Sequence, residues 1–226
     1  MNEENLNKLR QKVRDLSSDY QQKNDFTGWF EVIYTDALGN PEGVPWAKMQ
    51  PHPCLENWLK TATISEKKAL VIGCGLGDDS EVLAQYNANV TAFDIAPSSI
   101  EWCKKRFQNS SVNYLVADLL DLDNGWKNSF DFIFESRTIQ ALPISIRRKV
   151  IEAIATLLKP GGTLLIVTRL REGEEEDFQG PPWAVSEQEL SQLYEYGYQE
   201  VNRIPYLDAN NPSIKQALIE YKSNLV

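Results

Sequence analysis

Residues 69–80 decide the fold of this chain, and they read Ala69-Leu70-Val71-Ile72-Gly73-Cys74-Gly75-Leu76-Gly77-Asp78-Asp79-Ser80. An apolar run too short for a globular helix leads into three glycines at alternate positions, and residues 80–84 then read as a helix start. Glycines let the backbone turn sharply and let a ligand approach where a Cβ would block it, while the helix N-terminus offers unpaired N–H groups. The stretch therefore predicts a strand, a tight turn and a helix beside a nucleotide-like ligand.

The glycine spacing narrows the choice of ligand. It is G-x-G-x-G, and Asp78 stands where a dinucleotide fingerprint, G-x-G-x-x-G, needs its last glycine. This departure argues against NAD or FAD as the ligand. A purely structural turn is the alternative explanation of the glycines.

The length and charge of the chain limit its class. Its 226 residues favour one domain with a sizeable core. A formal net charge of −9 disfavours nucleic acid and anionic membrane surfaces, which bind clustered Lys and Arg, so a small-molecule partner is expected. No run of about 18 apolar residues exists, and the start Met1-Asn2-Glu3-Glu4 is unlike a signal peptide. We expect a soluble, cytoplasmic protein, either a monomer or a small homo-oligomer.

The cysteines and the single histidine argue against a metal or disulfide framework. Cys54, Cys74 and Cys103 are odd in number and contain no C-x-x-C pair, which fits a reducing compartment. His52 is the only histidine, so no His-rich metal site is expected.

The first 60 residues differ in character from the rest. Apolar residues at three- and four-residue spacing predict a helix over about residues 3–23. Residues 25–59 combine many prolines and glycines with the aromatic residues Trp29, Phe30, Tyr34, Trp46 and Trp58. This composition predicts a loop-rich lid or site wall, with aromatic filling of the core edge as the alternative. The expected units are therefore 1–60, a helix and aromatic lid segment, and 61–226, the ligand-binding domain.

The rest of the chain alternates between strand and helix patterns. Further strands are predicted at 88–94, 112–116, 130–135 and 163–168, with two more near 198–204 and 214–221. Helices are predicted at 97–107, capped by Ser98 or Ser99, at 147–158, stopped by Pro160-Gly161-Gly162, and at 186–195. The acidic residues 172–177 read as a solvated loop. The expected fold is α/β: a Rossmann-like, doubly wound, mostly parallel seven-stranded sheet with helices on both faces.

Two carboxylates follow predicted parallel strands. Asp94 ends the second strand and Asp118 follows the third. Ligands of doubly wound sheets bind at such carboxyl ends. An ionised Asp94 can accept both hydroxyl hydrogens of a ribose, and Asp118 can accept from an adenine amino group. A helix cap or a solvated loop acid is the alternative for each.

These motifs together resemble a known family. The glycine loop, Asp94, Val116-Ala117-Asp118 and Phe130-Asp131-Phe132-Ile133-Phe134-Glu135 are similar to the class I S-adenosylmethionine-dependent methyltransferases. Three further segments resemble the thiopurine and halide/thiol methyltransferase group: Val44-Pro45-Trp46 with Pro51-His52-Pro53-Cys54-Leu55, Arg137-Thr138-Ile139-Gln140-Ala141-Leu142-Pro143 with Arg147, and Gly180-Pro181-Pro182-Trp183-Ala184-Val185-Ser186.

The resemblance implies S-adenosylmethionine as the cofactor. Its implied contacts are the covering residues Trp29 and Trp46, the glycine-loop residues Gly73, Cys74, Gly75 and Gly77, the ribose-binding Asp94 with Ile95, the adenine-flanking Asp118 with Leu119, and Glu135. Two positions depart from the family pattern. Val71 stands where class I enzymes commonly have an acid that supports the loop, and Ala47 replaces the acid that commonly follows Pro-Trp. Other residues are therefore expected to bind the methionine amino group.

The reaction implied is in-line methyl transfer. It depends on alignment, exclusion of water and desolvation of the nucleophile. A thiol with a pKa near 8.5 supplies a few per cent of thiolate at neutral pH and needs no strong base. We therefore expect methylation of a small molecule with a thiol or other soft nucleophile. A small-molecule O- or N-methyltransferase and a non-catalytic S-adenosylmethionine-binding protein are the alternatives.

The candidate catalytic residues are Glu135, Arg137 and Gln140, which follow the fourth strand. Arg137 could bind an anionic substrate and Glu135 could accept a proton, or the two could simply pair with each other. His52 could act as a base or be an exposed loop histidine. Cys74 is expected to pack between the glycines, and no covalent cysteine intermediate is expected.

Overall fold

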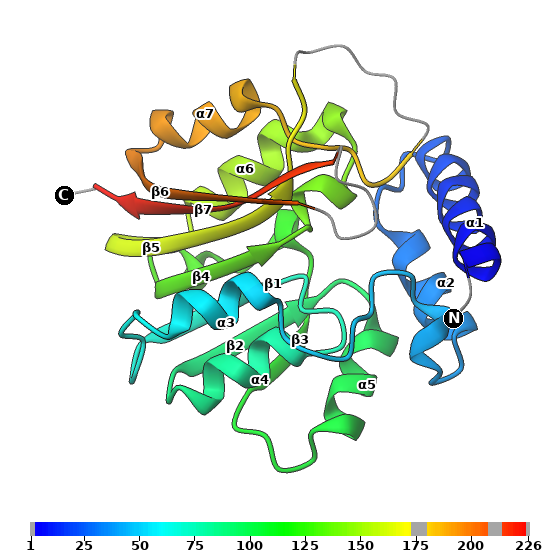
Figure 1. Ribbon diagram of the computed structural model, residues 1–226, viewed down its shortest axis with the longest axis horizontal. Helices are drawn as coiled ribbons and strands as arrows, with labels where there is room; N and C mark the ends of the chain where they lie inside the picture. The colour runs from blue at the N-terminus through cyan, green and yellow to red at the C-terminus, as the bar shows by residue number, and fades with distance from the viewer. Residues whose placement is uncertain (1–2, 173–179, 208–213, 225–226) are drawn as a thin grey trace.

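The computed structural model describes residues 3–172, 180–207 and 214–224, and a single sheet organises them (Figure 1). Seven strands lie in the order β3-β2-β1-β4-β5-β7-β6. Their bounds are β1 Lys68–Ile72, β2 Asn89–Asp94, β3 Asn113–Val116, β4 Phe130–Ser136, β5 Leu158–Arg169, β6 Tyr198–Leu207 and β7 Lys215–Ser223. All neighbouring pairs are parallel except those of β7, which runs antiparallel to both β5 and β6. The predicted mostly parallel, seven-stranded sheet is confirmed.

Helices cover both faces of this sheet. α3 (Pro53–Leu59), α4 (Asp78–Gln85) and α5 (Pro97–Arg106) pack on one face, over a core that includes Val71, Phe132 and Phe134. α6 (Arg147–Ala155) and α7 (Glu187–Glu195) pack on the other, over Leu70 and Ile133. Strands that are apolar on both faces need helices on both faces, which explains their near-continuous apolar runs.

The N-terminal helices stand at the end of the sheet where the parallel strands finish (Figure 1). α1 (Glu3–Gln21) packs against α2 (Gly28–Asp36), and α2 packs against α5. The segment predicted to be rich in loops, residues 25–59, contains the nine-residue helix α2, and the prolines of the segment all lie beyond that helix. α3 places Leu55 and Leu59 in the sheet core. The division of the chain at residue 60 stays a prediction.

Two local expectations are corrected. α6 ends at Ala155, and Pro160-Gly161-Gly162 lie inside β5 rather than after a helix. The β4–β5 register shifts there, from Phe130↔Leu158 to Phe132↔Thr163, so the Pro-Gly-Gly segment forms an irregular, bulged stretch of the kind that accommodates a proline inside a sheet. At α5, neither Ser98 nor Ser99 caps the helix, because Ala96 holds the N-cap position and Pro97 begins the helix.

Short 3₁₀ turns complete the described chain, at Pro41–Gly43, Leu119–Asp121, Asn124–Trp126, Ile139–Ala141 and Ile144–Ile146. Within the described residues, no helix is long and apolar enough to cross a bilayer. The predicted acidic loop lies outside the described residues except for Glu172, which pairs with Lys215. The strand order reverses between β1 and β4, so the segments that follow these two strands diverge and leave the position where doubly wound folds bind ligands.

Candidate functional site

The three glycines after β1 have different structural tasks. All three have positive φ values, 60° at Gly73, 54° at Gly75 and 90° at Gly77. A Cβ on Gly73 would overlap the hydroxyl of Thr138, and one on Gly77 would lie 2.6 Å from the Tyr114 hydroxyl. A Cβ on Gly75 would meet only the Tyr34 hydroxyl, at 3.5 Å. Gly73 and Gly77 therefore permit packing within the protein, whereas Gly75 leaves space above the loop.

The glycine loop is held from α5. Ser99 Oγ and Cys103 Sγ both donate to the carbonyl oxygen of Gly75, the latter at 3.2 Å. Arg106 forms a two-pronged ion pair with Asp78, at 2.9 and 2.7 Å. Asp78, which replaces the last glycine of the dinucleotide fingerprint, thus anchors the start of α4.

Asp94 ends β2 and points at the same loop. Its Oδ2 accepts from Gly75 N and its Oδ1 from Ala96 N, both at 3.0 Å. The side chain is buried, and burial raises the pKa of Asp94 to about 6 against the opposing effect of these N–H bonds. Each carboxylate oxygen keeps a further acceptor site. Ile95 follows it and is half-buried.

Asp118 and Leu119 lie beside Asp94 at the end of the next strand. The Asp94↔Val116 pair closes the β2–β3 register, and Ala117 N donates to Asp94 O at 3.1 Å. Asp118 accepts from Leu120 N at 2.8 Å and so caps the turn that contains Leu119, which is buried.

The predicted aromatic cover is a cluster above the loop. Trp29 is 1% exposed and lies edge-on to Trp46, with 6.0 Å between ring centroids. Trp46 Nε1 donates to the Tyr34 hydroxyl at 2.9 Å, and that hydroxyl is the group nearest the open side of Gly75. Trp29 on α2 thus fills the core, while Tyr34, one of the aromatic residues of the predicted lid, faces the loop.

Glu135 lies one residue before the end of β4 and is fully buried. Its Oε1 accepts from Thr138 N and Ile139 N, whereas Oε2 has no hydrogen-bond partner among the described residues. Burial raises the pKa of Glu135 to about 7, opposed by these two N–H donors. It does not form an ion pair with Arg137 within the described chain, so the simple pairing alternative is wrong.

Arg137 and Gln140 form hydrogen bonds with residues other than Glu135. Arg137 has a φ of 67° and donates through Nη2 to Gln216 Oε1 at 3.1 Å. Gln140 is buried, and its Oε1 accepts from Arg169 N at 2.6 Å. Its main-chain oxygen accepts from Trp183 N at 2.7 Å. Gln140 therefore ties the segment after β4 to β5 and to the Gly-Pro-Pro-Trp segment.

His52 is half-buried rather than exposed. It is the N-cap of α3, and its Nδ1 accepts from Cys54 N at 3.2 Å. Burial, reinforced by Arg137, lowers the pKa of His52 to about 4. Its backbone N donates to Asp79 Oδ1 at 2.6 Å, and burial raises the pKa of Asp79 to about 6. The ring is therefore neutral near pH 7, with its proton on Nε2.

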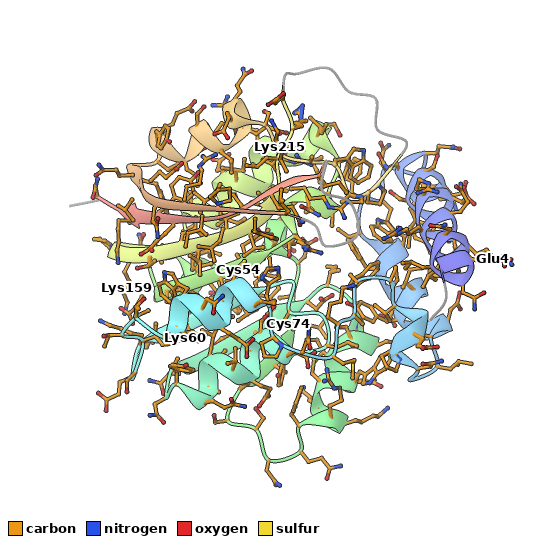
Figure 2. All side chains as sticks on the ribbon, in the orientation of Figure 1. Glu4, Cys54, Lys60, Cys74, Lys159 and Lys215 are labelled. Carbon is orange, nitrogen blue, oxygen red and sulfur yellow. The ribbon has the colours of Figure 1, made fainter. Side chains whose placement is uncertain are left out.

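The segments carrying these residues converge at one end of the strands. In Figure 2, Cys54 at the start of α3 and Cys74 in the glycine loop lie near the centre of the view, whereas Lys159 lies at the left, at the other end of the sheet. A hydrogen bond with the neighbouring Cys103 thiol, together with burial, raises the pKa of the Cys74 thiol. Within the described residues, no group of three or more His, Cys, Asp or Glu side chains is arranged to hold a metal ion.

Comparison with known proteins identifies the family. The family model described as Thiopurine S-methyltransferase matches residues 40–224 of this chain. The chain belongs to the thiopurine S-methyltransferase family. It is therefore an S-adenosylmethionine-dependent methyltransferase, as the resemblance of its motifs predicted.

Individual proteins that resemble this methyltransferase share only modest sequence identity with it. A probable thiol methyltransferase 2 of Arabidopsis thaliana is 28% identical over 187 residues, which are 81% of this chain and 78% of that protein. A ubiquinone biosynthesis O-methyltransferase of Xanthomonas campestris is 37% identical over 103 residues, 45% of this chain and 42% of that protein. The N-methyltransferase NodS of Bradyrhizobium japonicum, solved with S-adenosylhomocysteine, shares the fold with a TM-score of 0.67 at 20% identity, over 86% of this chain and 98% of that chain.

The geometry of the methyltransferase site fits its cofactor. Gly75 leaves open space above the loop, and Asp94 keeps acceptor capacity beside it. The Tyr34 and Trp46 side chains lie over the same loop. Sequence reasoning did not single out Asp79, Tyr206 and Gln216, because their contacts cross between elements, and it named Tyr34 only among the aromatic residues of residues 25–59.

Proposed function

We propose that this protein transfers the methyl group of S-adenosylmethionine to a small molecule through a thiol or another soft nucleophile. The observation that carries the proposal is His52, whose Nδ1 accepts from Cys54 N and whose ring is held neutral. With its remaining ring nitrogen protonated, it is no base for a hydroxyl or amine. A thiol, which already ionises appreciably near neutral pH, needs none. The similarity to a probable thiol methyltransferase of Arabidopsis thaliana supports this choice.

The proposed cofactor contacts follow the segments described above. Gly73, Cys74, Gly75 and Gly77 shape the loop for the methionine end of the cofactor, and Glu135 lies beside them. Asp94 and Ile95 take the ribose, and Asp118 with Leu119 flanks the adenine. Trp46 covers the site, and Trp29 supports it from beneath.

The chain contributes to the reaction by aligning the two reactants and by excluding water from the site. The bound cofactor supplies an electrophilic sulfonium methyl group. Aromatic faces attract such a cation by about 0.5–2 kcal/mol, which positions it rather than activates it. Glu135, Arg137 and Gln140 are proposed to act on the acceptor side: Arg137 by its charge, Gln140 by fixing the segment after β4, and Glu135 by holding that segment through Thr138 N and Ile139 N.

A small-molecule O- or N-methyltransferase is the second candidate. The partial match to an O-methyltransferase and the pKa of Glu135 near 7 favour it, since that value suits a general base at neutral pH. In that case Glu135→Gln lowers kcat while leaving cofactor affinity intact. A small-molecule acceptor, a cytoplasmic location and a monomeric or small homo-oligomeric state are proposed with both candidates.

The deciding experiment measures S-adenosylhomocysteine release from S-adenosylmethionine with separate acceptors. The panel contains iodide, hydrosulfide, an aromatic thiol, a thiopurine, a phenol and a carboxylate. Turnover confined to the sulfur compounds or iodide supports the first candidate. Turnover of the phenol or carboxylate alone replaces it with the second.

A further inference from the structure

The N-terminus of α5 has no cap from its own segment. Ala96 holds the N-cap position with a side chain that cannot accept a hydrogen bond, and the first turn, Pro97-Ser98-Ser99-Ile100, contains no acid. Pro97 carries no N–H, and Ser99 N donates to Ala96 O at 3.1 Å. The N–H of Ser98 is therefore the donor that a capping side chain would ordinarily bind, and its acceptor has to come from outside the segment.

Glu31 on α2 supplies that acceptor from 67 residues away. Its Oε2 accepts from Ser98 N at 3.0 Å, and its Oε1 accepts from Ser98 Oγ at 2.5 Å. Thr35, one turn further along α2, donates to the same Oε1 at 3.2 Å. Negative charge at a helix N-terminus also complements the helix dipole. A carboxylate from α2 thus caps α5 and joins the two helices.

The capped turn carries the contacts that hold the proposed cofactor site. Ala96 N donates to Asp94 Oδ1, and Asp94 Oδ2 accepts from Gly75 N. Ser99 Oγ, from the residue after Ser98, donates to Gly75 O at 2.5 Å. The carboxylate proposed for the ribose and the glycine with open space above it are therefore both bonded to residues within two positions of Ser98.

The helix that carries Glu31 also reaches the glycine loop at a second point. Tyr34 lies three residues after Glu31, so the two side chains share one face of α2. The Tyr34 hydroxyl is the group nearest the open side of Gly75, and it accepts from Trp46 Nε1 at 2.9 Å. A shift of α2 away from α5 would therefore move the aromatic cover together with the cap.

We propose that Glu31 is a positioning residue for cofactor binding: by capping α5 from α2, it holds Asp94 and the Gly75 loop in the arrangement that binds S-adenosylmethionine. The inference rests on the cofactor contacts proposed above and adds a residue that acts through Ser98 rather than on the cofactor. Loss of the cap lowers the fraction of molecules in the binding arrangement, and the apparent affinity falls with that fraction.

Calorimetric titration of S-adenosylhomocysteine tests this role without a methyl acceptor. Glu31→Ala removes both acceptor oxygens, and its Kd should rise about tenfold, as expected when one charge-assisted capping bond is lost. Glu31→Gln keeps an oxygen for Ser98 N but loses the charge, so its Kd should rise about threefold. Glu101→Ala is the matched control, since its carboxylate lies largely exposed on α5, 3.7 Å from Lys105 Nζ, and its Kd should equal that of wild type.

A double-variant cycle tests whether Glu31 acts through Ser98. Ser98→Ala removes the hydroxyl donor and keeps the N–H, so its Kd should rise about threefold. Glu31→Ala combined with Ser98→Ala should bind like Glu31→Ala alone, because the shared contact is already lost. Effects on Kd that multiply in the double variant would overturn the assigned path.

A purely structural role for Glu31 gives a different result. Glu31→Ala would then lower the melting temperature and leave the Kd of the folded protein unchanged, which overturns the proposal. If Glu31→Ala does not fold, Glu31→Gln decides in its place by the same comparison of Kd with melting temperature. If wild type binds S-adenosylhomocysteine but methylates no sulfur compound, only the proposed acceptor class fails. If wild type does not bind S-adenosylhomocysteine, the proposed cofactor contacts and this inference both fail.

Discussion

The hydroxyl of Thr138 occupies the space in which a side chain at Gly73 would begin. The same hydroxyl donates to the carbonyl oxygen of Ile72 at 3.1 Å, so the segment after β4 is bonded directly to the end of β1. Gly73 therefore allows two strand ends to meet at the point where the strand order reverses. Gly75, two residues on, contacts little and leaves its space to a ligand.

This contrast predicts different consequences for two otherwise equal substitutions. An Ala at either glycine suffers the same left-handed strain of about 1–2 kcal/mol. Gly73→Ala adds a clash with Thr138, so its melting temperature falls further than that of Gly75→Ala. Gly75→Ala instead loses at least about tenfold in S-adenosylhomocysteine affinity, because its Cβ points into the open space. Calorimetry and thermal unfolding measure both effects.

A double variant tests the cause of the Gly73 defect. Combining Gly73→Ala with Thr138→Ala removes the overlapping hydroxyl and should recover part of the lost stability. Strictly additive losses in the double variant would contradict the assigned contact.

Replacing Glu135 with Gln should stabilise the protein by an amount that depends on pH. Its folded pKa of about 7 lies above the ordinary value, so its protonated form favours folding at low pH and that contribution is lost as pH rises through 7. In Glu135→Gln the amide oxygen keeps the bonds from Thr138 N and Ile139 N and no buried charge forms. The variant should be up to about 3 kcal/mol more stable than wild type at pH 8.5 and should equal wild type near pH 4, below the ordinary pKa of 4.5. Urea titrations at both pH values measure this, and a variant less stable at pH 8.5 would refute it.

Cofactor binding should weaken in acid, because Asp94 becomes protonated. Its pKa of about 6 means that the carboxylate gains a proton, and loses acceptor capacity, as pH falls through 6. S-adenosylhomocysteine affinity of wild type should fall below that pH by as much as about tenfold per unit, while Asp94→Ala binds weakly throughout. Asp131→Asn, altered at the other end of β4, should follow the wild-type curve. An unchanged affinity in Asp94→Ala would remove Asp94 from the site.

Local sequence patterns are enough to predict most of the fold and part of the candidate site. Apolar runs with no polar face locate β1 to β4, and the acids at their ends follow directly, as Asp94 does. Contacts between distant segments have no such pattern: Arg137 and Gln216 are 79 residues apart, and only the β7 reversal brings them together. Gln140 reads as a catalytic candidate in sequence but bonds β5 through Arg169 N. In sequence, Pro160-Gly161-Gly162 resembles the end of a helix. In the structure it forms a bulge in β5, and that bulge depends on pairing with β4, which a local pattern does not show.

Substitutions of two adjacent arginines on α6, Arg147 and Arg148, should differ greatly in their effect on stability. Arg147 is 1% exposed and donates to Leu142 O, Trp183 O and the Glu189 carboxylate, so it joins the segment after β4 to the Gly-Pro-Pro-Trp segment. Burial lowers the pKa of Arg147, opposed by Glu189, yet the side chain stays charged at neutral pH. Its removal leaves buried carbonyl oxygens unpaired.

Arg147→Met should therefore destabilise the protein by about 3–5 kcal/mol. Arg148→Met is the matched control: its pair with Glu195 is largely exposed, and its loss should change stability by no more than about 0.5 kcal/mol. Because Arg147 and Gln140 both hold Trp183, Arg147→Met should also raise the acceptor KM more than it weakens S-adenosylhomocysteine binding. Urea unfolding followed by tryptophan fluorescence measures the first effect, and initial rates the second. Equal stability of the two variants would show that apolar packing replaces the buried ion pair without loss.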